Sequence, residues 1–168
     1  SSVTNTRLRS AGDDGTDWLM YSGSYSGQHY SRLDLIDRTT VARMRLKWLY
    51  QLDSGEDPVE AIPLVVDDVM YVAVPPNSVI ALRVADGKLL WKYSRDLIGE
   101  LSILYRTSRG LAAYGDRVYM GTLDARLVAL DARTGQPSWE VEVARPEDGY
   151  SITGAPLAVD GKIVTGVS

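Results

Sequence analysis

Short runs of apolar residues alternate with turn residues along most of this 168-residue chain. The clearest case is the stretch 109–143, which contains the runs LAAY, RVYMGT and RLVALDA and a last run around Trp139. Turn residues such as Gly115-Asp116 separate these runs. Short runs rich in β-branched and aromatic residues, bounded by turn residues, are typical of an antiparallel meander. We therefore predict one sheet of four antiparallel strands for residues 109–143.

The same pattern occurs once upstream, at a spacing of 48 residues. Positions that keep their residue type at that spacing include Tyr71 and Tyr119, Ala81-Leu82 and Ala129-Leu130, Gly87 and Gly135, and Trp91 and Trp139. A third copy begins at Ala155 with PLAVDGKIVTGVS. Four-stranded repeats of this period are the sequence signature of a β-propeller blade. A blade cannot bury both faces alone, so we expect the Trp four residues after each turn Gly to dock between adjacent blades.

This repeat predicts an all-β fold and divides the chain into parts. We predict a disordered or processed N-terminus over residues 1–16 and a partial β-propeller over residues 17–168. The propeller part is expected to comprise a lead-in (17–58), a blade (59–93), a linker (94–108), a second blade (109–143) and the start of the next blade (153–168). The chain has room for about three blades, whereas closed propellers have at least four. Remaining blades or further copies of the chain must then complete the ring, and a short protein that closes its ring by association is one version of this.

The lead-in lacks the blade pattern, because Gly, Ser and Tyr replace the alternating apolar residues. We expect most of it to wrap one blade as a loop. Asp37 or Thr39 is placed to cap a short helix over residues 41–46, which then delivers the chain to a strand at 46–52.

Composition and charge exclude several classes of function. The chain has 18 basic and 22 acidic residues, a net charge of -4 and no block of like charge, so nucleic acid is not an expected partner. The absence of cysteine excludes disulfides and thiolate metal sites in this segment. No apolar run approaches the roughly 20 residues of a membrane span, and no signal peptide is present. His29, the only histidine, lies in a Gly/Ser/Tyr-rich loop and is interpreted as a surface or hydrogen-bonding residue.

Three polar residues stand at comparable places, each leading into the first strand of its blade: Glu60, Arg109 and Thr153. First strands line the central channel of a propeller, so these side chains are candidates to converge on one axial ligand. A carboxylate at the start of an apolar strand must face solvent or meet a donor or cation. The alternative is that each residue only satisfies a local turn.

From Trp18 to Ser168 the chain resembles the N-terminal part of the pyrroloquinoline quinone (PQQ) dependent alcohol dehydrogenases, the quinoprotein methanol and ethanol dehydrogenase family. Four segments carry the resemblance: HYSRLDLIDRTTVARMRLKW, VEAIPLVVDDVMYV, RGLAAYGDRVYMGTLDARLVALDARTG and ITGAPLAVDGKIVTGVS. The third segment is the most specific, because it combines the blade spacing with residues that are typical of the family. The resemblance implies about three blades of an eight-bladed ring.

The resemblance also implies a cofactor site on the ring axis. Glu60 would hydrogen-bond the quinone, Arg109 would pair with its acidic or carbonyl oxygens, and Thr153 and Ser168 would bind a carboxylate edge. PQQ carries three carboxylates and an electrophilic ortho-quinone, for which a guanidinium fork and hydroxyl donors are suitable partners. In the family, Ca²⁺ acts as a Lewis acid on the quinone carbonyl, an aspartate takes the alcohol proton and hydride passes to the quinone.

Two features depart from the family pattern. Ile103 and Leu104 stand where many members have a vicinal Cys-Cys pair stacked on the quinone. The sequence ends at Ser168, before the expected glycine and the glutamate that ligates calcium, and the catalytic aspartate is not among these residues. We therefore expect no catalytic residue and no metal ligand in this chain, and no turnover of alcohol by it alone. The implied full enzyme is periplasmic and oxidises primary alcohols to aldehydes with a cytochrome c type electron acceptor.

A second class of function stays open at this point, namely a non-catalytic propeller that serves as a binding or assembly scaffold. Outer-membrane assembly lipoproteins have Trp-docking repeats of the same type with a purely structural role. Glu60, Arg109 and Thr153 distinguish the two hypotheses, because a scaffold has no need for these polar residues at equivalent positions of successive blades.

Overall fold

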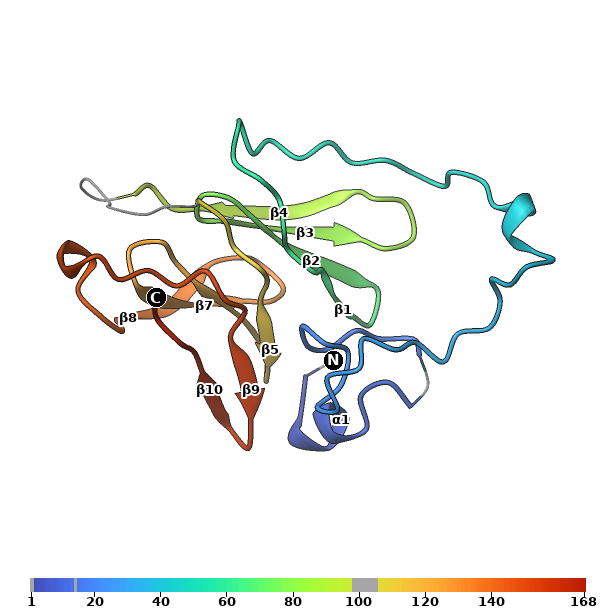
Figure 1. Ribbon diagram of the computed structural model, residues 1–168, viewed down its shortest axis with the longest axis horizontal. Helices are drawn as coiled ribbons and strands as arrows, with labels where there is room; N and C mark the ends of the chain where they lie inside the picture. The colour runs from blue at the N-terminus through green and yellow to red at the C-terminus, as the bar shows by residue number, and fades with distance from the viewer. Residues whose placement is uncertain (1, 14, 98–105) are drawn as a thin grey trace.

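The computed structural model describes residues 2–13, 15–97 and 106–168 and consists mainly of antiparallel sheets (Figure 1). The first sheet contains β1 (Leu64–Val66), β2 (Val69–Val74), β3 (Ser78–Arg83) and β4 (Leu89–Ser94) in that order. The second contains β5 (Ala112–Tyr114), β6 (Arg117–Gly121), β7 (Arg126–Asp131) and β8 (Pro137–Glu142). A hairpin of β9 (Leu157–Val159) and β10 (Lys162–Val164) begins a third. The all-β prediction of two four-stranded blades and the start of another is confirmed.

The two complete sheets have the same register, as the 48-residue repeat predicts. Ala81 pairs with Trp91 in the first sheet and Ala129 pairs with Trp139 in the second. In both sheets the register shifts immediately after the alanine. The repeat therefore extends to the irregularities of the strands, and equivalent side chains lie on equivalent faces.

Each turn glycine receives a tryptophan from the preceding part of the chain. The indole of Trp91 covers Gly135 so closely that a Cβ on this glycine would lie 2.5 Å from the ring. The Trp91 Nε1 also donates to the carbonyl oxygen of Ala132 at 3.0 Å. Trp48 lies on Gly87 in the same way, and its Nε1 donates to the carbonyl oxygen of Val84 at 2.9 Å. The predicted docking of tryptophan between blades is confirmed for Trp91, whereas the equivalent Trp139 is 41% exposed and covers no described glycine.

Residues 46–52 do not form the predicted strand. The segment is extended, and Trp48, Tyr50 and Leu52 pack against the apolar face of the first sheet, while Leu46 and Leu49 are exposed. A strand requires a hydrogen-bonded neighbour, and no described segment pairs with this one. Three side chains of the segment therefore contact the sheet, but the hydrogen-bonded ladder that defines a strand is not formed.

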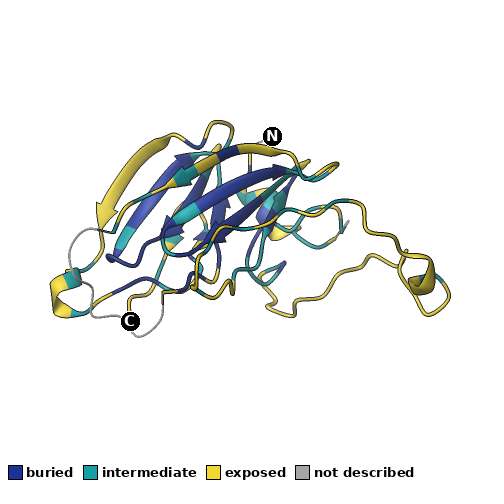
Figure 2. Cartoon of the chain, turned by 90° about the horizontal axis from the view of Figure 1, so that it is seen from above, coloured by how far each residue is buried: buried dark blue, intermediate teal, exposed yellow. Residues whose placement is uncertain are grey.

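The helix expected over residues 41–46 is a single 3₁₀ turn, η1 (Val41–Arg43). Neither Asp37 nor Thr39 is its N-cap: that position is Thr40, which makes no side-chain capping hydrogen bond. Asp37 Oδ1 instead accepts from the backbone N–H groups of Thr39 and Thr40, in the turn just before η1. Figure 2 shows that this part of the lead-in extends away from the sheets and is exposed. A short amphipathic segment gains little helical stability without a surface to pack on, so the turn is not propagated.

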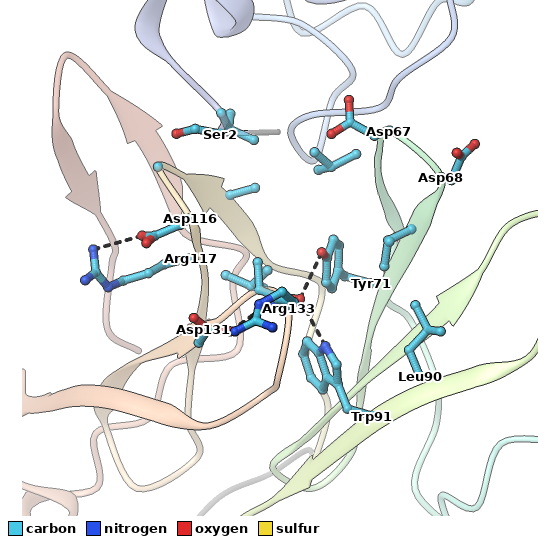
Figure 3. A pocket seen from close by; sticks show the side chains of 17 residues that line it. Ser2, Asp67, Asp68, Tyr71, Leu90, Trp91, Asp116, Arg117, Asp131 and Arg133 are labelled. Carbon is cyan, nitrogen blue, oxygen red and sulfur yellow. Dashed lines mark hydrogen bonds and ion pairs between the residues drawn. The ribbon is translucent and has the colours of Figure 1, made fainter.

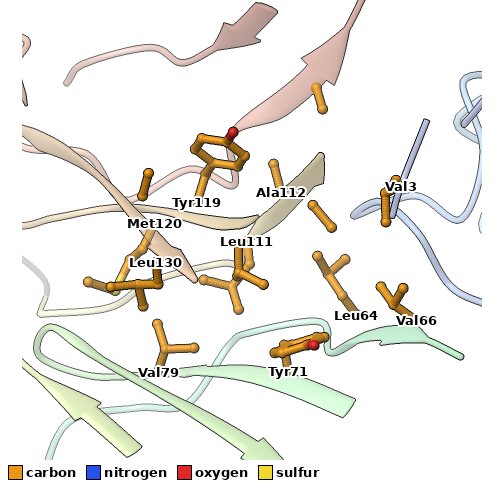
Figure 4. Packing of buried hydrophobic residues seen from close by; sticks show 14 of the residues in the cluster. Val3, Leu64, Val66, Tyr71, Val79, Leu111, Ala112, Tyr119, Met120 and Leu130 are labelled. Atoms are coloured by element: carbon orange, nitrogen blue, oxygen red, sulfur yellow. The ribbon is translucent and has the colours of Figure 1, made fainter. Parts of the chain in front are cut away.

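The main core lies between the first and second sheets (Figure 4). From the first sheet it contains Leu64, Tyr71 and Val79, and from the second Met120 and Leu130. All of these side chains are buried. Since this core joins residues of both repeats, neither sheet buries its apolar surface by itself.

Part of the N-terminal segment, for which the sequence predicts a disordered or processed terminus, packs against the sheets. It contains helix α1 (Asn5–Arg9), capped by the Thr4 hydroxyl, which accepts from the backbone N–H of Arg7 at 3.3 Å. Leu8 is 1% exposed, and Val3 pairs with Gly115 at the edge of the second sheet. The apolar residues Val3 and Leu8 anchor a stretch that its polar composition alone assigns to disorder.

Ion pairs extend this anchoring to the turns of the first and third sheets. Arg7 pairs with Asp17 at 2.7 Å and with Asp67 of the β1–β2 turn at 3.1 Å. Arg9 pairs with Asp160 of the β9–β10 turn at 2.6 Å. The N-terminal segment therefore lies across the turns of the first and third sheets. Neither α1 nor the two 3₁₀ turns of the described ranges has the length and apolarity that crossing a membrane requires.

We predict that Gly135→Ala destabilises the chain by about 2 to 3 kcal/mol, because the added Cβ collides with Trp91 and the backbone is left-handed, with φ +73°. Gly55→Ala is the matched control, since its φ is +59° and nothing lies within 4 Å of the added Cβ. The control is expected to cost about 1 kcal/mol. Urea unfolding followed by tryptophan fluorescence measures both, and equal losses would contradict the docking argument.

We predict that Tyr71 makes stability depend on pH in the alkaline range. Burial raises the pKa of Tyr71 to about 12, with the charges of Asp67 and Asp131 acting in the same direction. An unfolded tyrosine has a pKa of about 10, so the stabilisation by the neutral phenol is present below pH 10 and is lost as the pH rises toward 12.

Tyr71→Phe removes the hydrogen bond from the hydroxyl to the carbonyl oxygen of Ala132 and is expected to cost about 1 kcal/mol at pH 8. The difference in free energy of unfolding between Tyr71→Phe and the unmodified chain should be smaller at pH 11 than at pH 8. Urea unfolding at the two pH values measures this, with Tyr30→Phe, at an exposed ring, as the control. A difference that stays constant with pH would refute the prediction.

Candidate functional site

The segments that lead into the first strands lie side by side. The backbone N–H of Ile62 donates to the carbonyl oxygen of Arg109 at 3.1 Å, and the N–H of Arg109 donates to that of Thr153 at 2.9 Å. Gly110 has φ +153° and pairs in parallel with Ile62, where a Cβ would lie 3.4 Å from the Ile62 carbonyl oxygen. Stacked blades thus bring three chain segments, distant in sequence, into one hydrogen-bonded row.

Glu60, Arg109 and Thr153 meet at this row. One terminal nitrogen of Arg109 lies 3.4 Å from Glu60 Oε2, and the other donates to Thr153 Oγ1 at 3.0 Å. The side chains of Arg109 and Glu60 are 44% and 46% exposed. The structure therefore brings together the three residues that the sequence aligned. It also shows that Glu60 both faces solvent and meets a cation.

Ser168, the fourth residue of the expected site, lies beside a different residue. Its backbone N–H and carbonyl group pair with those of Ser151, at 3.0 and 2.9 Å. Ser151 precedes Thr153 by two residues in the same lead segment. The structure shows no hydrogen bond from Ser168 to Glu60, Arg109 or Thr153 among the described residues.

Buried hydroxyl groups fix the backbone beneath the three side chains. Thr107 is 1% exposed, and its hydroxyl donates to the carbonyl oxygen of Pro58 at 3.3 Å. Ser151 is also buried, and its hydroxyl donates to the carbonyl oxygen of Ser168. The first bond joins the segments before β1 and β5, and the second joins the segment before β9 to the residue that follows β10. The backbone around the site is therefore hydrogen-bonded although its charged side chains reach solvent.

The chemistry of this arrangement suits an anionic ligand. Arg109 presents a guanidinium fork with donors beyond those used by Glu60 and Thr153, and such forks bind carboxylates in a bidentate manner. The Thr153 hydroxyl adds a neutral donor, and Glu60 is an acceptor for a protonated group. Within the described ranges, no three His, Cys, Asp or Glu side chains are grouped so as to hold a metal ion.

A cavity of about 650 Å³ lies elsewhere, between the first two sheets (Figure 3). It opens at the β1–β2 and β5–β6 turns, at the opposite ends of the first strands from Glu60 and Arg109. Its two aromatic polar groups, the Tyr71 hydroxyl and the Trp91 Nε1, both donate to the carbonyl oxygen of Ala132. This cavity is part of the packing seam between blades, and we do not assign the site to it.

The fold is that of β-propeller blades, because the sheets are equivalent and a tryptophan docks between them. The segments that precede the first strands lie side by side and carry a polar site. The family model described as PQQ: Glucose/ethanol/alcohol dehydrogenase, beta-propeller domain, matches residues 18–168. The chain therefore belongs to the PQQ-dependent dehydrogenase propeller family, as the sequence resemblance predicts.

Individual relatives agree with this assignment. The chain is 39% identical over 167 residues to quinohemoprotein alcohol dehydrogenase ADH IIB of Pseudomonas putida, covering 98% of this chain and 24% of that protein. The structure of quinohemoprotein alcohol dehydrogenase ADHIIG from Pseudomonas putida HK5 matches with a TM-score of 0.89 and 36% identity, over 99% of this chain and 25% of that one. A europium-containing methanol dehydrogenase matches with a TM-score of 0.86 and 33% identity, over 98% and 29%. The chain thus spans about a quarter of the length of the curated relative.

Two buried polar residues at the same end of the sheets, Asn77 and Asp124, were not among the residues predicted from the sequence. Asn77 and Asp124 are 2% exposed and lie in the turns between the second and third strands of successive blades. The available signal was their place between strongly apolar runs, where a polar side chain needs a partner. Ile103 and Leu104, the positions aligned with the vicinal cysteines, lie outside the described residues.

We predict that the Glu60–Arg109 ion pair contributes less than about 1 kcal/mol to stability, because both side chains are nearly half exposed. A double-mutant cycle of Glu60→Gln and Arg109→Gln, each of which removes one charge of the pair, gives the coupling free energy when measured by urea unfolding. A coupling above about 2 kcal/mol would mean that the pair is a structural element and not an accessible binding group.

Proposed function

We propose that this chain supplies part of the cofactor site of a PQQ-dependent alcohol dehydrogenase. The main support is that Glu60, Arg109 and Thr153 meet, although each precedes the first strand of a different blade. The two terminal nitrogens of Arg109 lie 3.4 Å from Glu60 Oε2 and 3.0 Å from Thr153 Oγ1. The match of residues 18–168 to the family supports this reading of the site.

The donor set fits PQQ. Its three carboxylates and its ortho-quinone oxygens are acceptors, and Arg109 and Thr153 are donors whose positions are held by their leads. The carboxylate of Glu60 has the same sign of charge as the cofactor, so it fits when Arg109 neutralises it and it accepts from a protonated group of the ligand. Ser168 would add a second hydroxyl donor at a carboxylate edge.

In this proposal the residues of the chain bind and orient. Bound PQQ supplies the electrophilic carbonyl that accepts hydride from the alcohol. Arg109 holds the anionic oxygens, Glu60 fixes the direction of the Arg109 fork, and Thr153 limits rotation of the ligand by donating from one side. In this proposal none of these three residues is the base that takes the proton of the alcohol.

For the complete enzyme we propose oxidation of primary alcohols to aldehydes in the periplasm, with Ca²⁺ at the quinone and a cytochrome c type acceptor. Relatives described as quinohemoprotein alcohol dehydrogenases support the alcohol substrate and a haem acceptor. A relative described as a europium-containing methanol dehydrogenase supports a metal ion in such enzymes. The 168 residues alone are expected not to turn over alcohol.

A purely structural propeller is the less favoured alternative. A scaffold needs buried, well-packed contacts between its blades, which the Trp91–Gly135 contact already supplies. The Glu60–Arg109 pair is half exposed and adds little to such packing. An accessible charged cluster at equivalent blade positions is better explained by a ligand.

We predict that the chain binds PQQ and that Arg109→Ala weakens binding by at least about tenfold, with Arg109→Lys intermediate because it keeps the charge and loses the fork. Titration of PQQ, followed by quinone absorbance together with intact mass and oligomeric state, measures this. Arg83→Ala is the matched control, since Arg83 forms an exposed pair with Asp86 at 2.6 Å in the β3–β4 turn. Absence of binding in every oligomeric state, or equal binding by Arg109→Ala, would contradict the proposal.

A further inference from the structure

Asp124 is a buried carboxylate in the β6–β7 turn, and its side chain is only 3% exposed. A buried charge is strongly unfavourable unless it is paired and hydrogen-bonded. Arg95, at the end of β4, provides the pairing, with its Nε and one terminal nitrogen at 3.4 and 3.1 Å from Asp124 Oδ2. Since Arg95 belongs to the first blade, this buried pair crosses from one blade to the next.

Asn77 makes a second connection between the same two turns. Its side chain oxygen accepts from the backbone N–H of Leu123 at 2.9 Å, and its amide nitrogen donates to Asp124 at 3.5 Å. The backbone N–H of Arg95 in turn donates to the carbonyl oxygen of Asn77 at 3.0 Å. The first blade thus holds the β6–β7 turn through both its backbone and its carboxylate.

The same turn holds the lead of the third blade. The carbonyl oxygen of Thr122 accepts from the backbone N–H of Ile152 at 3.0 Å. Ile152 is 1% exposed and packs directly on Gly121, where a Cβ would lie 2.1 Å from its side chain. Ile152 immediately precedes Thr153, so the position of the β6–β7 turn sets the position of the Thr153 hydroxyl.

We propose that Asp124 is a positioning residue for the Glu60–Arg109–Thr153 site. Asp124 fixes the β6–β7 turn against the first blade, the turn fixes Ile152, and Thr153 then fixes Arg109 through two hydrogen bonds, one to its backbone N–H and one to its guanidinium. The effect on cofactor binding rests on the proposed function, whereas the effect of Asp124 on the positions of Ile152, Thr153 and Arg109 does not.

A second arginine of the charged cluster, Arg126, also reaches this turn, with its Nε 3.8 Å from Asp124 Oδ2. Arg126 pairs with Glu142 at 3.0 Å and with Glu140 at 3.3 Å, and these glutamates lie on β8 with half-exposed side chains. Glu142→Gln therefore removes a charge from the same cluster without touching Asp124 or Arg95. It serves as the matched control for Asp124→Asn, which keeps the size of the side chain and removes its charge.

The experiment measures hydrogen exchange of single backbone amides by NMR at pH 7 in the chain and its two variants. The reporting amides are Ile152 and Arg109, which donate across the leads, and the reference is Trp18, which donates to Val65 at 2.8 Å in another part of the fold. Asp124→Asn is expected to raise exchange at Ile152 and Arg109 about tenfold and to leave Trp18 unchanged. It should also raise the Kd for PQQ several-fold, whereas Glu142→Gln should change neither readout.

Two results would overturn the positioning role. One is unchanged exchange at Ile152 and Arg109 in Asp124→Asn, and the other is an equal rise at all three amides, which indicates general destabilisation. If Asp124→Asn does not fold, Arg95→Lys takes its place, because it keeps the opposite charge and loses the fork that holds Asp124. Failure of the unmodified chain to bind PQQ would refute the proposed function, and the exchange pattern would still decide whether Asp124 holds the leads.

Discussion

The contact between a tryptophan and the turn glycine of the next sheet is the interaction on which the rest of the structure depends. Trp91 covers Gly135 and Trp48 covers Gly87, each with an indole hydrogen bond to a backbone carbonyl group of the same turn. A four-stranded sheet has two apolar faces and cannot bury both alone. This contact fixes the distance between neighbouring sheets, and the core between them can then close around Leu64, Met120 and Leu130.

The polar site is a geometric result of that stacking. Once neighbouring sheets are held in the same register, the segments before their first strands lie next to each other and form backbone hydrogen bonds. Side chains that are about one blade apart in sequence then meet within hydrogen-bonding distance. The charged tips stay exposed while the backbone below them is tied by buried hydroxyl and carboxylate groups. Accessibility and rigidity are therefore provided by different residues.

The fold was largely predictable from the sequence because its main determinants repeat. Gly87 and Gly135, with their tryptophans four residues later, give the period, and the runs between them give the strands. Glu60, Arg109 and Thr153 were predictable as a group since each leads into a first strand. Their mutual contacts follow from register, although the sequence could not give the distances.

The features that were missed depend on contacts between distant segments. The N-terminal helix is held by Val3 on Gly115 and by Arg9 on Asp160, which local composition does not reveal. Residues 46–52 have the period of a strand, but strand formation also needs a hydrogen-bonding neighbour. The pairing of Asp124 with Arg95 joins different blades, so neither residue alone identifies it.

The tryptophan contact also has a direction. Each sheet provides a tryptophan on one side and a glycine turn on the other, so its two sides are complementary to each other and not to themselves. Such an interface is heterologous, and a two-fold axis cannot satisfy it. Any assembly that extends this contact must therefore be head to tail, and its outcome is a closed ring when the rotation per blade divides the circle and an open filament when it does not.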